Sequence, residues 1–336
     1  MKPVLAPIFL SAVAFSARAP AAHVELRAIA RAPIGNIGYT LVLSPDEREL
    51  YIAQHYGNTV AVFSLRLNRV LKTIAVGQMP MSLTIPRDGK RVLVGEWLGQ
   101  LSAIDTASGT VAPHRVGGRV AGLAMSADGE TIYLAMCRSG LRKLNTRTGQ
   151  MQTIYSQFCP WGIALSPDQK SLWVNFQGGG PGGSWGHDAI AQFDTATGKL
   201  IGAVTGLANV GGSIAVSPDG KRVWADGLDA CSVRAYDHVG CPAVPSGIVH
   251  VIDAATKKLI RTLPKASGGF VVLSPDGTMA ALTGAHVLLL DARDFRPLAT
   301  FPEQMGGAVF SRDSRRIYLT GILKPEVVVL DIRRIP

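Results

Sequence analysis

The sequence predicts an all-β fold, a seven-bladed β-propeller with four-stranded antiparallel blades, and three observations support this prediction. A turn motif recurs seven times along the 336 residues, every repeat holds the same order of short strands, and the composition is rich in turn-forming residues. The 37 glycines and 20 prolines suit many tight turns, and a chain that is 47% hydrophobic can fill a large core.

The clearest copy of the turn is Ser217–Gly220, which lies between the apolar runs Ile214–Val216 and Val223–Trp224. Pro218 presets φ, the aspartate bonds local backbone and the glycine adopts positive φ, so we expect a type I turn closed by a left-handed residue. The copies align on their turn aspartates, which are Asp46, Asp88, Asp128, Asp168, Asp219, Asp276 and Asp313. Their spacings of 42, 40, 40, 51, 57 and 37 residues are typical of propeller blades.

Each copy contains four predicted strands in the same order. A small, apolar strand such as Gly162–Leu165 comes first, and the turn leads to a second strand such as Ser171–Val174. A third strand ends in Asp or Asn, and a more polar fourth strand such as Lys199–Val204 is expected to face solvent. The seventh copy ends with its third strand, Glu326–Asp331, so we expect His23–Ile29 to complete the last blade and close the ring.

Residues 1–22 resemble a signal peptide. Lys2 precedes the apolar run Val4–Ala17, and the small residues of Ala17–Ala22 follow it. We therefore expect a periplasmic or extracellular protein in which residues 23–336 form one propeller domain. The apolar run is too short to span a bilayer, and no later segment resembles a transmembrane helix.

The four cysteines fit an oxidising compartment. Cys231 and Cys241 bracket a short insert and form the natural first pair, which leaves Cys137 to pair with Cys159, although three connectivities remain open. Metal ligation is a weaker interpretation, because the sequence contains no Cys-x-x-Cys spacing.

The net charge of the chain is +10, and removal of Lys2 and Arg18 with the leader leaves +8. A basic surface can attract nucleic acid, anionic lipid or an acidic partner. The arginines and lysines are scattered, without long runs or interleaved aromatic residues, so the pattern favours a soluble surface and nucleic acid is not the expected partner.

The repeat resembles a known family. Its pattern, Pro-x-Gly-x-Ala-x-Ser-Pro-Asp-Gly followed by a Tyr/Trp-Val strand, is similar to the 40-residue YVTN-type β-propeller repeat. Cys159–Asp168 followed by Leu172–Asn175 matches it best, and the resemblance covers residues 24–336. It implies a fold like those of the quinohaemoprotein amine dehydrogenase β chain, the haem d1 domain of nitrite reductase and lactonase-like enzymes. It supplies no catalytic residue, because none of their site patterns matches here.

The two long spacings place extra residues after the second strands of the fourth and fifth copies, at Gln177–Asp188 and Asp226–Gly247. Loops at this position in neighbouring blades emerge on one face, so we expect binding beside the channel mouth on blades 3 to 5. The candidate ligand-binding residues are His55, Glu96, Trp97, Arg119, Trp161, Asn175, His187, Asp226 and His238. They suit a small polar or aromatic ligand, while a hydrogen-bonded loop residue is the plain alternative for each of them.

Two motif matches lack their structural context. Gly182–Gly186 fits Gly-x-Ser-x-Gly, but a nucleophile elbow needs a strand before it and a helix after it. Gly178–Gly183 fits the dinucleotide fingerprint without a surrounding βαβ unit. The histidines are dispersed, so we assign no metal ligand and no catalytic residue, and the sequence requires no cofactor.

The leading interpretation is an exported scaffold, a monomer or a subunit of a hetero-complex. It would bind a protein partner or a small polar ligand at the channel mouth without chemistry of its own. The alternative is a propeller enzyme or redox-enzyme subunit. Such a protein would be either lactonase-like with a divalent cation or, like quinoprotein β chains, a partner of a cofactor-bearing subunit.

Overall fold

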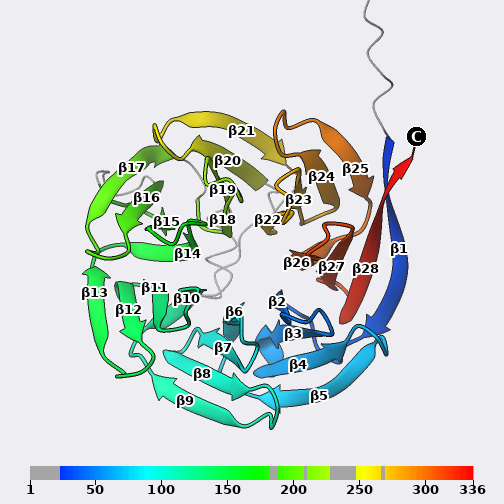
Figure 1. Ribbon diagram of the computed structural model, residues 1–336, viewed down its shortest axis with the longest axis horizontal. Helices are drawn as coiled ribbons and strands as arrows, with labels where there is room; N and C mark the ends of the chain where they lie inside the picture. Colours follow the sequence, from blue (N-terminus) through cyan, green and yellow to red (C-terminus); the bar gives the residue numbers. More distant parts are fainter. Residues whose placement is uncertain (1–22, 182–187, 208–209, 228–246, 266–268, 336) are drawn as a thin grey trace, which may run out of the picture.

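The computed structural model describes residues 23–181, 188–207, 210–227, 247–265 and 269–335. It shows seven four-stranded antiparallel sheets arranged in a ring, with the first strand of each blade beside the central channel (Figure 1). The predicted fold is therefore confirmed. The predicted leader, residues 1–22, lies outside the described residues.

The first four blades are formed in the order of the sequence. In each of them the four strands run in sequence order from the channel to the outer edge of the disc. Blade 1 contains β2 (Thr40–Leu43), β3 (Glu49–Gln54), β4 (Thr59–Ser64) and β5 (Arg69–Ala75), with the short 3₁₀ helix η1 (His55–Gly57) after β3. Blade 2 contains β6 (Pro80–Thr84), β7 (Arg91–Glu96), β8 (Gln100–Asp105) and β9 (Val111–Arg115). Blade 3 contains β10 (Arg119–Met125), β11 (Thr131–Cys137), β12 (Gly140–Asn145) and β13 (Met151–Tyr155). Blade 4 contains β14 (Cys159–Leu165), β15 (Ser171–Gln177), β16 (Asp188–Asp194) and β17 (Leu200–Leu207).

The last three blades complete the ring. Blade 5 contains β18 (Ile214–Val216), β19 (Arg222–Gly227), β20 (Gly247–Asp253) and β21 (Leu259–Lys265). Blade 6 contains β22 (Val271–Leu273), β23 (Met279–Leu282), β24 (Val287–Asp291) and β25 (Pro297–Phe301). Blade 7 contains β26 (Met305–Phe310), β27 (Arg316–Gly321), β28 (Glu326–Ile335) and, outermost, β1 (His23–Pro33).

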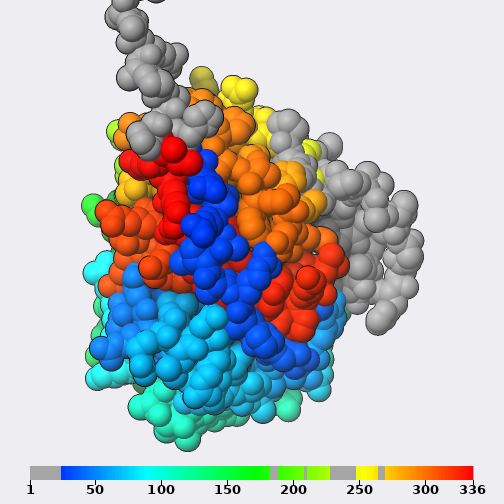
Figure 2. All heavy atoms as spheres, turned by 90° about the vertical axis from the view of Figure 1, so that its right-hand side faces the viewer, coloured from blue at the N-terminus to red at the C-terminus, as the bar shows by residue number. Residues whose placement is uncertain are grey.

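The ring is closed by the two ends of the described chain. β1 pairs with β28 in antiparallel register from His23 opposite Ile335 to Pro33 opposite Glu326. The two strands lie side by side at the outer edge of the disc in both views (Figures 1 and 2). The N-terminal strand thus supplies the fourth strand that the seventh repeat lacks, as predicted, and covers an edge that would otherwise be open to pairing.

The repeated turn is held by the side chains that define its motif. In blade 5 the Ser217 hydroxyl donates to the Asp219 carboxylate at 2.6 Å, and the Lys221 N–H donates to the same oxygen at 3.0 Å. The Arg222 N–H donates in turn to the Ser217 hydroxyl at 2.9 Å. The equivalent Ser–Asp hydrogen bond occurs in five other blades, between Ser44 and Asp46, Ser126 and Asp128, Ser166 and Asp168, Ser274 and Asp276, and Ser311 and Asp313.

The residue after each turn aspartate has left-handed φ, between 56° and 74°, which confirms the predicted closing residue. These residues are Glu47, Gly89, Gly129, Gln169, Gly220, Gly277 and Ser314. Each lies against the turn of the preceding blade. The Arg312 N–H donates to the Glu47 carboxylate at 2.6 Å, and a Cβ added to Gly277 would lie 3.5 Å from Pro218. The seven turns therefore contact one another around the ring.

The core lies between neighbouring sheets, where side chains of the inner strands are covered on both sides. Trp173 and Trp224 are fully buried, and Tyr51 of blade 1 packs in one cluster with Val92 of blade 2. The outer strand β5 instead alternates exposed and partly buried residues. This gradient from apolar inner strands to half-exposed outer strands agrees with the polarity that the sequence predicts.

We predict that the fold loses stability in acid through its turns. The Ser217 hydroxyl and the Lys221 N–H hold the pKa of Asp219 below its usual value, and the equivalent serine does the same for Asp46, Asp128, Asp168 and Asp313. Because these pKa values are lower in the folded chain than the unfolded value of about 3.9, their contribution is complete above that pH and is lost as the pH falls through the folded values. The urea midpoint should stay level from pH 7 to 5 and fall below about pH 4.

The control is the variant Asp219→Asn, which should start from a lower midpoint at pH 7 and show a shallower fall in acid. The series is repeated in 0.5 M salt to screen repulsion between the many basic side chains. An unchanged midpoint down to pH 2.5 would contradict the prediction.

Candidate functional site

A cavity of about 420 Å³ lies on the axis of the ring. All seven blades line it through the residue seven positions before the turn aspartate. These residues are Tyr39, Met81, Ala121, Trp161, Gly212, Gly269 and Gly306. The repeat therefore predicts which residues face the channel once the turns are aligned.

The cavity lining is asymmetric and mostly apolar. Blades 1 to 4 present Tyr39, Met81, Ala121 and Trp161 at the shared position, whereas blades 5 to 7 present glycine. Phe270 of blade 6 occupies the space beside the glycines, and its ring meets that of Tyr39 edge-on at 5.5 Å between centroids. Aromatic rings of blades 1 and 6 thus contact each other in the cavity wall, and aromatic side chains are common in sites for small organic ligands.

His55 lies in the cavity wall in η1, directly after β3. Its Nδ1 is 3.3 Å from the carbonyl oxygen of Pro80 in blade 2, so the Nδ1–H donates this hydrogen bond. The imidazole packs between the rings of Tyr39 and Tyr56, at 5.5 and 4.9 Å. Burial lowers the pKa of His55 despite this bond, so the side chain is neutral at neutral pH.

Trp97, Arg119 and Trp161 come together beside the cavity, although they belong to blades 2, 3 and 4. The indole rings of Trp97 and Trp161 are 5.2 Å apart, and the Arg119 guanidinium lies 5.1 Å from the Trp97 ring. Both tryptophans are nearly buried in a cluster with Met81 and Cys137. The structure thus places three of the predicted ligand-binding residues in one group, whereas their role in binding stays a prediction.

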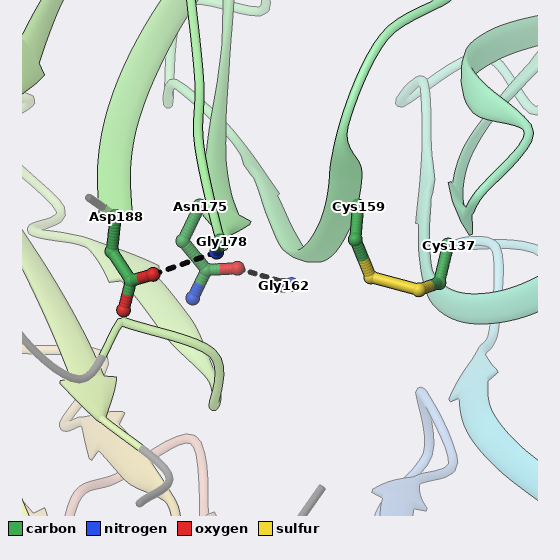
Figure 3. The surroundings of a disulfide bond; sticks show 6 residues. All are labelled: Cys137, Cys159, Gly162, Asn175, Gly178 and Asp188. Atoms are coloured by element: carbon green, nitrogen blue, oxygen red, sulfur yellow. Dashed lines mark hydrogen bonds between the residues drawn. A yellow bond between two sulfur atoms is a disulfide. The ribbon is translucent and has the colours of Figure 1, made fainter. Parts of the chain in front are cut away.

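The disulfide joins the same blades. Cys137 at the end of β11 bonds to Cys159 at the start of β14, and so links blades 3 and 4 at the channel side (Figure 3). This confirms one predicted pair. The other predicted pair, Cys231 and Cys241, and the predicted binding residues His187 and His238 lie outside the described residues.

Asn175 has a structural role that the sequence analysis offered only as the plain alternative. Its side chain is fully buried, and its amide oxygen accepts a hydrogen bond from the Gly162 N–H of its own blade (Figure 3). Its Nδ2 donates at 2.9 Å to the carbonyl of Gly212 in the next blade. Thr283 bridges two inner strands in the same way, accepting from the Phe270 N–H and donating to the Gly306 carbonyl. These polar groups therefore join inner strands rather than face the cavity.

Glu96 is the last residue of β7 and Asp226 the last but one of β19, and both are fully buried. The Gly77 N–H donates to Glu96 Oε1 at 2.9 Å. Burial raises the pKa of Glu96, and hydrogen bonds from Ser102, Gly77 and Gln100 offset part of that rise. Neither residue is in the cavity lining. Of the seven predicted binding residues that are described, His55 and Trp161 line the cavity, Trp97 lies against Trp161, and Arg119 lies against Trp97.

Three exposed side chains on this face were not among the predicted binding residues, namely Tyr56, Leu98 and Leu323. All three stand ten residues after a turn aspartate, in the loop between the second and third strands of their blades. Alignment of the repeats would have identified them. At this loop position, three described blades carry a large apolar or aromatic residue, whereas the other described blades carry Arg138, Gly178 or His286.

The described residues contain neither a metal-binding cluster nor a membrane-spanning helix. Within them, no group of three or more His, Cys, Asp or Glu side chains is arranged to hold a metal ion. The same part of the chain has no helix with the length and apolar character of a membrane span.

Comparison with known proteins gives a fold relative. No protein-family model and no curated protein matches the sequence. Among solved structures, a chain of the Kuenenia stuttgartiensis hydrazine synthase is similar, with a TM-score of 0.74 and 20% sequence identity. The match covers 90% of this chain and 97% of that chain. At this identity the likeness shows the fold.

We predict that loss of the disulfide lowers stability without opening the ring. Because Cys137 and Cys159 are 22 residues apart, the cross-link restricts the unfolded chain by about 3 kcal/mol in the loop-entropy estimate. The double variant Cys137→Ser/Cys159→Ser should lose about this much free energy of unfolding, measured in urea, and keep its β-sheet circular dichroism. A variant as stable as the parent protein would contradict the prediction.

We predict that Asn175 supports the fold and not the ligand. Asn175→Ala removes both hydrogen bonds and leaves buried backbone groups unpaired, which should cost about 2 kcal/mol of unfolding free energy. Its affinity for the cavity ligand probed below should change less than about twofold, since the side chain is outside the cavity wall. A large loss of affinity at full stability would instead make Asn175 a binding residue.

Proposed function

We propose that this protein is an exported binding scaffold whose propeller channel takes up a small, uncharged aromatic or apolar ligand. The observation that supports it is the axial cavity, which all seven blades line with mostly apolar and aromatic residues. Its volume of about 420 Å³ falls within the range of small-molecule sites. Export is part of the proposal and depends on the leader-like residues 1–22.

The chemistry of the wall selects the ligand class. Tyr39, Trp161 and Phe270 offer ring faces, and His55 adds a neutral imidazole. A charged ligand would lose its hydration in such a wall, whereas a flat uncharged ligand gains contact with every ring. The sequence predicts a small ligand that is either polar or aromatic. The geometry of the wall favours the aromatic class.

Membership of the YVTN-type repeat family belongs to the same proposal. Its support is the agreement between the motif and the observed blades, since each predicted Asp turn joins the first two strands of a blade. That family resemblance bears on architecture and leaves the ligand to the cavity residues.

We predict that N-phenyl-1-naphthylamine, an uncharged aromatic fluorophore, binds the purified protein with one saturable site. Phe270→Ala removes one ring from the wall and should weaken this binding by about tenfold or more, because a buried aromatic side chain contributes about 1.5–3 kcal/mol. The control is Leu200→Ala, which truncates an exposed side chain on the outer strand β17. Binding is measured by fluorescence titration, with urea unfolding to confirm that both variants fold.

Absence of saturable binding, or equal affinity in the parent protein and Phe270→Ala, would reject the channel as the site. The enzyme alternative is tested on the same sample by elemental analysis for bound metal and by lactone hydrolysis with and without a chelator. Chelator-sensitive turnover would replace the scaffold proposal with the lactonase-like one.

A further inference from the structure

The three most exposed large apolar side chains of the described chain lie at one loop position in three consecutive blades. Leu323 of blade 7 is 74% exposed, Tyr56 of blade 1 is 78% exposed and Leu98 of blade 2 is 58% exposed. Each stands ten residues after its turn aspartate, at the tip between the second and third strands. We call these three tips the 7-1-2 rim.

The rim lies on the face of the ring where the cavity opens. Tyr56 belongs to the cavity wall, and Ile322, the neighbour of Leu323, does so as well. Blades 4 and 5, which have the longest connections after their second strands, stand across the ring from these blades (Figure 1). The cavity mouth and the 7-1-2 rim therefore share one face of the ring.

Positive charge flanks the apolar tips. Lys324 follows Leu323, and Arg138 occupies the same loop position in blade 3, next to Leu98 of blade 2 in ring order. Both side chains are exposed, and neither forms an ion pair among the described residues. The chain as a whole is also basic, with a net charge of +10, or +8 without residues 1–22, which adds to its attraction to an anionic surface.

The arrangement suits a lipid surface better than a protein. The apolar side chains are exposed singly, at the same position of three separate loops. A protein partner would need matching pockets, whereas a lipid interface accepts isolated Leu and Tyr side chains at the headgroup level and attracts the cations beside them. Two copies of the rim would bring like charges together, which opposes self-association.

We propose that the 7-1-2 rim docks this protein on an anionic lipid surface, with Leu323, Tyr56 and Leu98 inserted at the headgroup level. Leu98 and Leu323 are outside the cavity wall, so this docking and the binding of a ligand in the channel are separable.

The test uses vesicles of phosphatidylcholine with and without one quarter phosphatidylglycerol, and co-sedimentation of the full chain at 0.1 M salt. We expect binding to the anionic vesicles that weakens in 0.5 M salt and is weaker still on phosphatidylcholine alone. The variant Leu98→Ser/Leu323→Ser should bind roughly tenfold more weakly, since it removes two of the three inserted side chains. Its control, Leu200→Ser/Leu259→Ser, changes two exposed leucines on the outer strands β17 and β21 and should bind like the parent protein.

A second pair of variants locates the electrostatic part. Arg138→Ala/Lys324→Ala should weaken binding by roughly fivefold per charge. Arg87→Ala/Lys90→Ala removes two exposed cations from the turn between β6 and β7, on the opposite face, and should leave binding unchanged. If Arg87→Ala/Lys90→Ala alone abolishes binding, the turn face is the contact and the proposal is wrong.

A depth measurement makes the insertion itself testable. In Leu323→Trp the new indole should be quenched by brominated lipid and should shift to shorter wavelength on anionic vesicles, whereas in Leu200→Trp it should not. No binding to anionic vesicles, or equal quenching at the two positions, would overturn the proposal.

Discussion

Contact between neighbouring turns is the constraint on which this ring depends. Every turn aspartate accepts hydrogen bonds that place the next residue in left-handed conformation, and that residue lies against the turn of the preceding blade. Where the residue is glycine, a proline from the preceding blade packs against it, as Pro218 of blade 5 does against Gly277 of blade 6. Where it is Gln169, the side chain accepts a hydrogen bond from the Ala127 N–H at 3.0 Å instead. One local geometry therefore sets both the hairpin and the spacing of the blades.

On the opposite side of the disc the blades are joined by residues that do not repeat. Asn175 and Thr283 use an amide and a hydroxyl to bridge two inner strands, Glu96 accepts from a loop, and a disulfide links blades 3 and 4. Because these links differ from blade to blade, that face can vary its loops while the turn face holds the ring. The cavity and the 7-1-2 rim both lie on this variable side.

The fold was predictable because its determinants are local. Ser217, Asp219 and Gly220 act within one turn, and seven copies of that turn leave little choice of architecture. The closing strand was also predictable, since Glu326–Asp331 lacked a partner that His23–Ile29 could supply.

The candidate site was less predictable, because the same position is used differently in each blade. Glu96, Asn175 and Asp226 are polar residues near the starts of loops, yet tertiary packing buries all three. Trp161 and Phe270 lie in the cavity wall, because they stand at the inner strands that surround the channel. The polarity of a residue alone does not tell whether it will be buried between blades or will line the cavity. The exposure of Tyr56, Leu98 and Leu323 likewise depends on the tertiary packing around each loop.

The pairing of β1 with β28 has a consequence for the order of folding events. Six of the sheets are built from consecutive strands, so each can form from its own stretch of chain. The seventh joins residues separated by almost the whole sequence and therefore pays the largest loop-closure entropy. During synthesis this sheet is complete only after β28 has been made, and until then β1 has no partner. During synthesis, therefore, the ring can close only after the last strand has been made.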